Sequence, residues 1–176
     1  MENEGLVDYI AIRDMAYGIY DLEKEKVALG EDISQIRSEM AKVLGNKGLV
    51  KYVMIIANKK AYKEREIESL NMVSEILGVP VMTENYMPDE VTDPKVLEVR
   101  KELNSLITRY THLKDEQAII NSNIRDAYFQ VKNKGISVPC MKKLIDFMLH
   151  PDKLYNYRND TPLLEMYVEN VLPENS

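Results

Sequence analysis

The sequence has few residues that interrupt helices, and few of the residue types that some other folds need. It contains 7 glycines, 7 prolines, 1 cysteine and no tryptophan in 176 residues. Because glycine and proline mark turns and strand ends, their scarcity favours helices over a sheet. A single cysteine cannot form a disulfide within the chain, which indicates a reducing compartment. No apolar run approaches the roughly 20 residues that cross a bilayer. No signal peptide is recognisable, so we expect a cytoplasmic protein.

Sequence patterns for catalysis and metal binding are also missing. His112 and His150 have no neighbouring ligands at metal-binding spacing. Cys140 lies in an apolar stretch and is expected to be a core residue. There is no glycine-rich phosphate loop, and the carboxylates follow the solvent faces of predicted helices. We therefore expect a protein that is not an enzyme and that needs no metal and no cofactor.

The charge is acidic overall but unevenly distributed. The formal net charge is −6, yet seven basic residues and one acid lie between Lys42 and Arg65. Six basic residues and two acids lie between Lys132 and Arg158. Two basic segments on an acidic chain are typical of an electrostatic footprint for nucleic acid. The other interpretation is that lysines collect at helix ends, near the negative end of the helix dipole.

Two long segments have the apolar spacing of coiled-coil helices. From Ile12 to Val43 and from Val96 to Val131, the seam positions recur at alternating steps of three and four. A helix this long, on the order of 45 Å, needs a partner helix to cover its seam. The spacing leaves open whether the partners are parallel or antiparallel, and whether they belong to one chain or two. The predicted oligomerisation seam comprises Leu22, Lys26, Leu29, Ile33, Leu106, Leu113, Gln117, Ile120 and Ile124.

Shorter helices are predicted after each long one. A glycine-containing break at 45–48 ends the first long helix, and the apolar residues of 49–77 suit either one further helix or two. Asp93 and Pro94 suit the start of the second long helix, which Gly135 ends. Ser137 then caps a helix that runs to about 149, and a last helix starts near 161–162. We expect an all-α protein with a coiled-coil core, divided into a helical module at 7–78, a linker at 79–95 and a second module at 96–172.

The two modules look like copies of one another. At a constant offset of 91 residues the two seams overlay, and Lys26 falls on Gln117, each the only polar residue of its seam. An Asn-Lys-Gly break follows in both, at 46–48 and 133–135. The pattern predicts a tandem duplication. The alternative is that any two heptad helices overlay at some offset.

Three segments of residues 113–172 follow one another in a recognisable order: the long helix LKDEQAIINSNIRDAYFQVKNKG, then ISVPCMKKLI, then the terminal LLEMYVENVL. In this order and spacing they resemble the GapR-like family of nucleoid-associated proteins. The family resemblance implies an all-helical protein that forms dimers or tetramers and grips duplex DNA through backbone and shape contacts. It also implies a preference for AT-rich or overtwisted DNA and a place in the nucleoid. A homodimer is therefore expected here, and one chain with two copies would serve as two family protomers.

The resemblance also names candidate DNA-binding residues. Positions that match the family pattern give Lys132, Lys142 and Lys143 as lysines that face the duplex. The internal repeat adds Lys42, Lys51, Lys59 and Lys60 as second candidates. The chain departs from the family where further basic residues are expected, because Asp146, Met148 and Leu149 stand there. An alternative function is therefore a regulator or decoy that co-assembles with a GapR-like partner, or that blocks a DNA-binding protein by mimicking DNA.

Overall fold

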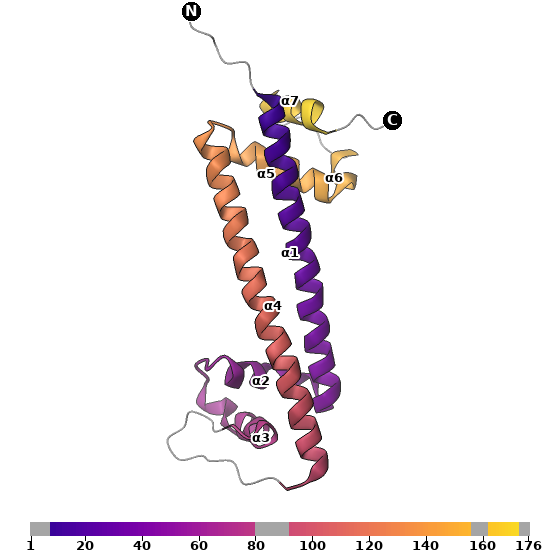
Figure 1. Cartoon of the computed structure of the whole chain (residues 1–176), viewed down its shortest axis with the longest axis vertical. Helices are drawn as coiled ribbons and strands as arrows, with labels where there is room; N and C mark the ends of the chain where they lie inside the picture. The colour runs from indigo at the N-terminus through magenta and orange to yellow at the C-terminus, as the bar shows by residue number, and fades with distance from the viewer. Residues whose placement is uncertain (1–7, 80–91, 156–161, 173–176) are drawn as a thin grey trace, which may run out of the picture. The chain divides into compact units, whose positions relative to one another are not determined.

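The structure of the chain is a computed structural model that describes residues 8–79, 92–155 and 162–172. Within these ranges every regular element is a helix and there is no strand, which confirms the all-α prediction. The long helices are α1 (Tyr9–Leu44) and α4 (Pro94–Asn133), shown in Figure 1. The shorter helices are α2 (Val50–Ala57), α3 (Ile67–Leu77), α5 (Val138–Leu149), α6 (Pro151–Tyr155) and α7 (Pro162–Val171). Two 3₁₀ turns, η1 (Lys47–Leu49) and η2 (Glu64–Glu66), precede α2 and α3.

Local sequence signals set the helix ends as predicted. The Asp93 carboxylate accepts a hydrogen bond from the backbone N–H of Lys95 at 2.9 Å, which caps α4. The Ser137 hydroxyl caps α5 in the same way. Gly45 and Gly135 adopt φ values of 63° and 73°, which only glycine adopts at little cost, and they end α1 and α4.

The open question of one or two helices in residues 49–77 is resolved as two. The turn between α2 and η2 contains Lys59, whose φ is 49°, outside the range that a helix allows. The predicted linker at 79–95 contains residues 80–91, which lie outside the described residues.

The chain divides into two compact units that are not consecutive in sequence. Unit 1 comprises Met1–Ala28 and Gln117–Ser176, and unit 2 comprises Leu29–Glu116. Each unit therefore contains one part of α1 and one part of α4. Unit 1 also contains α5, α6 and α7, which follow α4, and unit 2 contains α2 and α3, which follow α1. The predicted consecutive modules at 7–78 and 96–172, their duplication and the coiled coil stay predictions.

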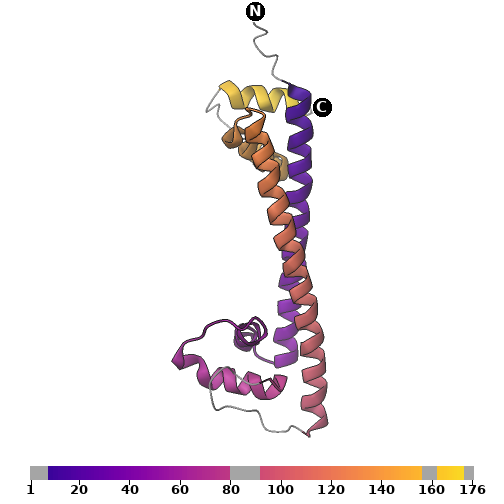
Figure 2. The same ribbon diagram turned by 60° about the vertical axis from the view of Figure 1, so that its left-hand side comes forward.

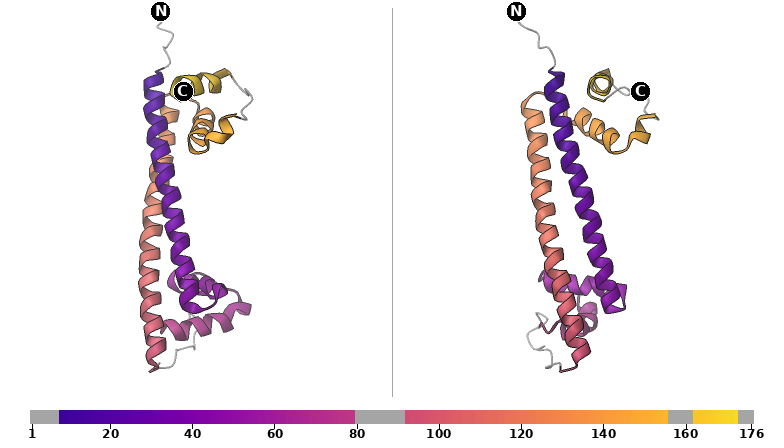
Figure 3. Two further views of the ribbon diagram at one scale, coloured as in Figure 1. Left: turned by 90° about the vertical axis from the view of Figure 1, so that its right-hand side faces the viewer. Right: turned by 45° about the vertical axis from the view of Figure 1, so that its right-hand side comes forward.

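Unit 1 is built on the first part of α1, which lies beside the last part of α4 (Figures 1 and 3). Ile12, near the start of α1, lines a cavity together with Gly135, just after the end of α4, so the two segments run antiparallel. Helices α5 and α7 pack on each other and on this pair. The buried core comprises Ile12, Ala16, Ile19, Val131, Met141, Leu144, Ile145, Tyr167 and Val171.

Unit 2 repeats this plan with the last part of α1 and the first part of α4, against which α2 and α3 pack (Figure 2). Glu39 of α1 and Arg109 of α4 approach to 3.4 Å in an ion pair, and these segments are also antiparallel. The Arg100 guanidinium donates hydrogen bonds to the carbonyls of Glu75 and Ile76, each at 2.9 Å, and so ties α4 to the end of α3. Gly78 ends α3 with a φ of 68°, and a side chain there would collide with that guanidinium. The buried core comprises Ile36, Met40, Val50, Val53, Met54, Val73, Leu77, Leu103 and Leu106.

Four of the nine residues of the predicted seam are buried within one chain. Ile33, Leu106, Ile120 and Ile124 are buried. The remaining five are half-buried: Leu22, Lys26, Leu29, Leu113 and Gln117. In each unit the antiparallel partner helix comes from the same chain, so the open question of partner direction is answered for these segments. The role of these residues in joining two chains stays a prediction.

Candidate nucleic-acid interface

Three predicted DNA-binding lysines lie around the turn that joins α4 to α5 in unit 1. Lys132 is in the last turn of α4, and Lys142 and Lys143 are in α5; all three side chains are exposed. We call these three residues the α4–α5 basic cluster. Helix ends and exposed amines are the groups that proteins commonly present to phosphate oxygens.

An aromatic ring connects the two helices of this cluster. The Lys142 amine lies 5.4 Å from the centre of the Tyr128 ring, within the range of a cation–π interaction. Lys132 is four residues after Tyr128 and therefore lies on the same face of α4. Burial, helped by the negative charge of Glu23, raises the pKa of Tyr128 to about 12, so its hydroxyl is neutral at pH 7. Tyr128 thus holds the Lys142 amine against α4 without adding charge.

The exposed side of α4 extends the cluster with residues that sequence reasoning missed. Arg125 and Lys132 are separated by seven residues, two helical turns, and both are exposed. Phe129 lies between them with 58% of its surface exposed. The sequence could have indicated Arg125, because a spacing of seven residues from Lys132 places both side chains on one face of a helix. An arginine and a lysine flanking an exposed aromatic ring form a surface that suits the backbone and groove of a duplex.

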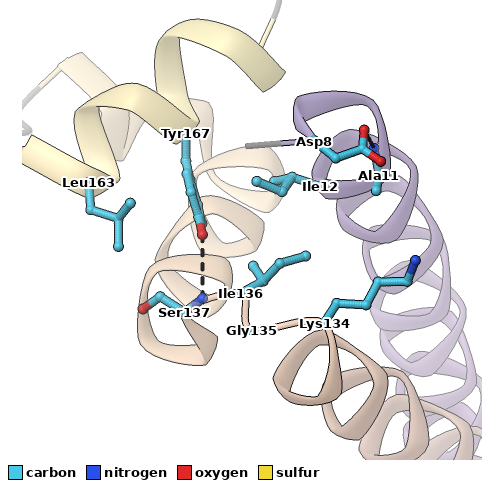
Figure 4. A pocket seen from close by; sticks show the side chains of 9 residues that line it. All are labelled: Asp8, Ala11, Ile12, Lys134, Gly135, Ile136, Ser137, Leu163 and Tyr167. Atoms are coloured by element: carbon cyan, nitrogen blue, oxygen red, sulfur yellow. Dashed lines mark hydrogen bonds between the residues drawn. The ribbon is translucent and has the colours of Figure 1, made fainter. Parts of the chain in front are cut away.

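A hydrogen bond fixes the turn that carries the cluster. The backbone N–H of Ser137 donates to the Tyr167 hydroxyl of α7 at 3.4 Å (Figure 4). Beside this bond is a cavity of about 500 Å³, also lined by Asp8, Lys134 and Leu163. Burial raises the pKa of Tyr167, and the Ser137 N–H partly opposes that shift, so the hydroxyl stays neutral at pH 7. Helix α7 therefore holds the α4–α5 turn in place.

The acidic departure from the family pattern is partly neutralised within unit 1. Both oxygens of Asp146 accept hydrogen bonds from the Lys153 amine of α6, at 2.7 and 2.9 Å. The side chains of Asp146 and Lys153 are about half exposed, so this ion pair contributes little to stability. It does offset the carboxylate charge that would repel phosphate on α5.

The four candidate lysines of unit 2 do not form one cluster in the same way. Lys42 is exposed in the last turn of α1, and Lys59 and Lys60 are exposed just after α2. Lys51 of α2 forms an ion pair with Glu66, whose other oxygen accepts the backbone N–H of Lys63 at 2.9 Å.

The ion pair stabilises the charged form of both partners in unit 2. The hydrogen bond from Lys51 lowers the pKa of Glu66, and the same contact raises the pKa of Lys51. Glu66 is buried, whereas the Lys51 side chain stays 59% exposed. Lys51 is therefore a charged, anchored side chain that still reaches solvent.

Other kinds of site are not found in the part of the chain that the structure describes. No group of three histidine, cysteine or acidic side chains comes together there in a way that could hold a metal ion. Across residues 8–79, 92–155 and 162–172, no helix is both long and apolar enough to cross a membrane. Cys140, expected in the core, is half-buried and packs against the unit 1 core.

A family model matches part of the C-terminal half of the chain. Residues 99–171 match the family described as "GapR-like, DNA-binding domain". Neither the curated proteins nor the solved structures contain a match to the chain. The resemblance expected from the sequence is thereby confirmed for this region. The match does not include the predicted N-terminal copy.

Proposed function

We propose, from the GapR-like DNA-binding domain that residues 99–171 form, that this chain grips duplex DNA through backbone and shape contacts and catalyses no reaction. The observation that carries the proposal is the exposed α4–α5 basic cluster of Lys132, Lys142 and Lys143. Each amine that approaches a phosphate releases condensed counterions, which favours binding to any sequence. These lysines need no base-specific geometry, so sequence preference would come from the shape and stiffness of the duplex.

The overall acidity of the chain does not oppose this proposal. Of the 23 basic and 29 acidic residues, 22 of each lie within the described ranges. The net charge of −6 therefore comes from residues 1–7, 80–91, 156–161 and 173–176. The described parts of the two units are therefore close to neutral. Local basic clusters can then attract phosphate at distances within the Debye length, which is about 8 Å at physiological salt.

A salt titration of DNA binding tests the proposal. Fluorescence anisotropy with an AT-rich duplex is expected to show binding that weakens steeply with salt. The variant Lys142→Glu/Lys143→Glu is expected to lose most of that binding, because two cations become anions at the interface. Lys24→Glu/Lys95→Glu is the matched control, since it makes the same charge change at exposed positions outside both the cluster and residues 99–171. Equal loss in both variants, or no binding by the wild-type chain at low salt, would contradict the proposal.

The proposed function includes a DNA preference, an oligomeric state and a location in the cell. Preference for AT-rich or overtwisted DNA, a homodimer and a place in the nucleoid follow from the family and not from any contact described above. Competition between AT-rich and GC-rich duplexes of equal length measures the DNA preference. Sedimentation with and without DNA measures the oligomeric state. A chain that sediments as a monomer in both states would remove the dimer from the proposal.

A second candidate function is co-assembly with a GapR-like partner protein as a regulator. It is favoured by large apolar side chains exposed on the long helices, among them Ile119, at 61%, and Phe129, at 58%. Such side chains become buried when helices associate. Mixing the chain with a single-domain GapR-like protein and measuring co-elution, together with loss of that protein's DNA binding, would favour this function over the first.

A further inference from the structure

Unit 2 contains a basic groove that the DNA-binding domain of residues 99–171 does not include. It lies between the last part of α1 and the segment formed by η1 and the start of α2, and its volume is about 730 Å³. Three cations line it: Arg37 of α1, Lys47 of η1 and Lys51 of α2. The hydroxyls of Ser34 and Ser38 also line it. None of the side chains that line the groove is a carboxylate.

The α1 side of the groove is made of small residues that leave the helix surface accessible. Gly30, Ser34, Ser38 and Ala41 recur at spacings of three and four, so they share one face of α1. Nothing lies within 4 Å of the position that a Cβ would take at Gly30. A ligand can therefore approach the helix backbone closely, while Arg37 rises beside it as the only long polar side chain on that wall.

The α2 side of the groove is anchored by the buried carboxylate of Glu66. Glu66 binds the Lys51 amine, and the Tyr52 ring lies 5.3 Å from the same amine. A lysine amine has three N–H donors, so the ion pair leaves donors that can turn toward the groove. At the groove's end the Gly48 backbone N–H is already bonded to the Asn46 side chain at 2.8 Å. The recognising groups are thus side-chain cations rather than a cradle of backbone N–H groups.

We propose that this groove binds the phosphate groups of a nucleic-acid backbone and gives the chain a second DNA contact. The inference rests on the proposed DNA-binding function and adds a site to it. A guanidinium can bind a phosphodiester with two parallel hydrogen bonds, and the lysines act as point charges on neighbouring phosphates. The cations come from three successive elements along the groove, so they can contact successive phosphates of one backbone.

The predicted repeat supports the same assignment. At the offset of 91 residues that overlays the two long helices, Ser34 and Ser38 fall on Arg125 and Phe129, which belong to the proposed interface of unit 1. The corresponding faces of the two long helices are therefore used in both units. The positive charge has a different source, because Arg37 and Lys47 supply it in unit 2.

The decisive experiment removes charge from the groove without touching the α4–α5 basic cluster. Duplex binding by full-length wild-type chain and by Arg37→Gln/Lys47→Gln is measured across a salt titration. If each cation contacts one phosphate, the variant's salt dependence falls by about one unit of slope for each residue changed. Its affinity falls severalfold, while Lys24→Gln/Lys95→Gln, which changes two exposed lysines outside both the groove and residues 99–171, behaves as the wild type. Circular dichroism confirms that helix content is unchanged.

The outcomes separate this inference from the proposed function. Wild-type binding together with an unaltered slope in Arg37→Gln/Lys47→Gln overturns the groove and leaves the proposed function in place. Failure of the wild type to bind duplex overturns both. Tripolyphosphate, added as a competitor at constant ionic strength, distinguishes a free polyphosphate from a backbone. If it saturates the groove, with Arg37-dependent affinity above that of duplex, the nucleic-acid assignment is wrong.

Discussion

The two units use one layout but present their lysines differently. In each, the end of a long helix is followed by a glycine turn and then by short helices that pack on each other and on the antiparallel helix pair. In unit 1, Lys142 lies over the Tyr128 ring. In unit 2, Lys51 is held by a buried carboxylate. The contrast teaches that one helical arrangement can present a lysine that lies over a neutral ring or a lysine whose charge is offset by a carboxylate.

The largest effect is expected from emptying the core of one unit. Leu144→Ala in unit 1 and Leu70→Ala in unit 2 each remove a fully buried side chain, which lowers the free energy of unfolding by about 2–5 kcal/mol. Amide hydrogen exchange would locate the weakened helices, expected in α5 and α7 for the first and in α2 and α3 for the second. Leu163→Ala is the control, because that leucine is 40% exposed. Equal loss of protection everywhere in both variants would show that the units do not unfold separately.

A smaller effect is expected at the hydrogen bond that fixes the α4–α5 turn. Tyr167→Phe keeps the buried ring and removes its bond to the Ser137 N–H, which costs about 0.5–1.5 kcal/mol. Urea denaturation measures the loss. DNA affinity is expected to fall slightly as well, because α5 carries Lys142 and Lys143. A fall in stability without any change in affinity would mean that the turn does not position the lysines.

Removing the anchoring carboxylate of unit 2 should make the two units more alike. Glu66→Gln leaves the Lys51 charge uncompensated beside the groove, and DNA affinity is expected to rise about two- to fivefold, the size of a weak ion pair. Anisotropy at low and moderate salt measures the change. Lys51→Gln/Glu66→Gln is the control and should return affinity to the wild-type level or below. An unchanged affinity in Glu66→Gln would indicate that Lys51 lies outside the contact.

The ion pair of Lys51 with Glu66 makes the stability of unit 2 depend on pH. The pKa of Glu66 is lowered from 4.5, chiefly by Lys51, so its stabilisation is present above that value and is lost as pH falls through the lowered pKa. The pKa of Lys51 is raised from 10.5, so its share is lost only as pH rises above that value. Acid denaturation followed by circular dichroism should show a shallower loss of stability in Glu66→Gln. An identical acid transition in the variant would contradict this account.

The smallest effect is expected at the acid of α5. Asp146→Asn removes a half-exposed carboxylate and releases Lys153, so DNA affinity should rise by no more than about twofold, as for other surface charge changes. The comparison variant Asp152→Asn changes an exposed acid in the neighbouring helix. A rise in DNA affinity larger than that of Glu66→Gln would mean that Asp146 of unit 1 opposes DNA binding more than Glu66 of unit 2 does.

Sequence reasoning was sufficient where the deciding interactions are local. Asp93 and Ser137 cap their helices, and Gly135 ends α4, because each signal acts within four residues. The heptad seam could not show that its partner comes from the same chain, because apolar spacing is the same for parallel and antiparallel pairs.

The candidate site was predictable in part. Lys132, Lys142 and Lys143 came from the family resemblance, and the structure shows them exposed around one turn. The pairing of Lys51 with Glu66 spans 15 residues and a loop, and no periodic pattern reports such a contact. Arg37 lies outside the two basic segments at 42–65 and 132–158, so the charge pattern does not single it out. Only the fold shows that it lines a groove together with Lys47 of η1.

The interleaving of the two units has a consequence for synthesis on the ribosome. Ile12, Ala16 and Ile19 leave the exit tunnel first, yet they complete a core whose other members, Met141 and Leu144, are made near the end. Unit 2, a continuous segment from Leu29 to Glu116, can form earlier. A fragment that begins at residue 96 therefore lacks the strip of α1 that covers α5 and α7. It should expose that apolar surface and aggregate, unless a peptide of residues 8–28 is supplied in trans.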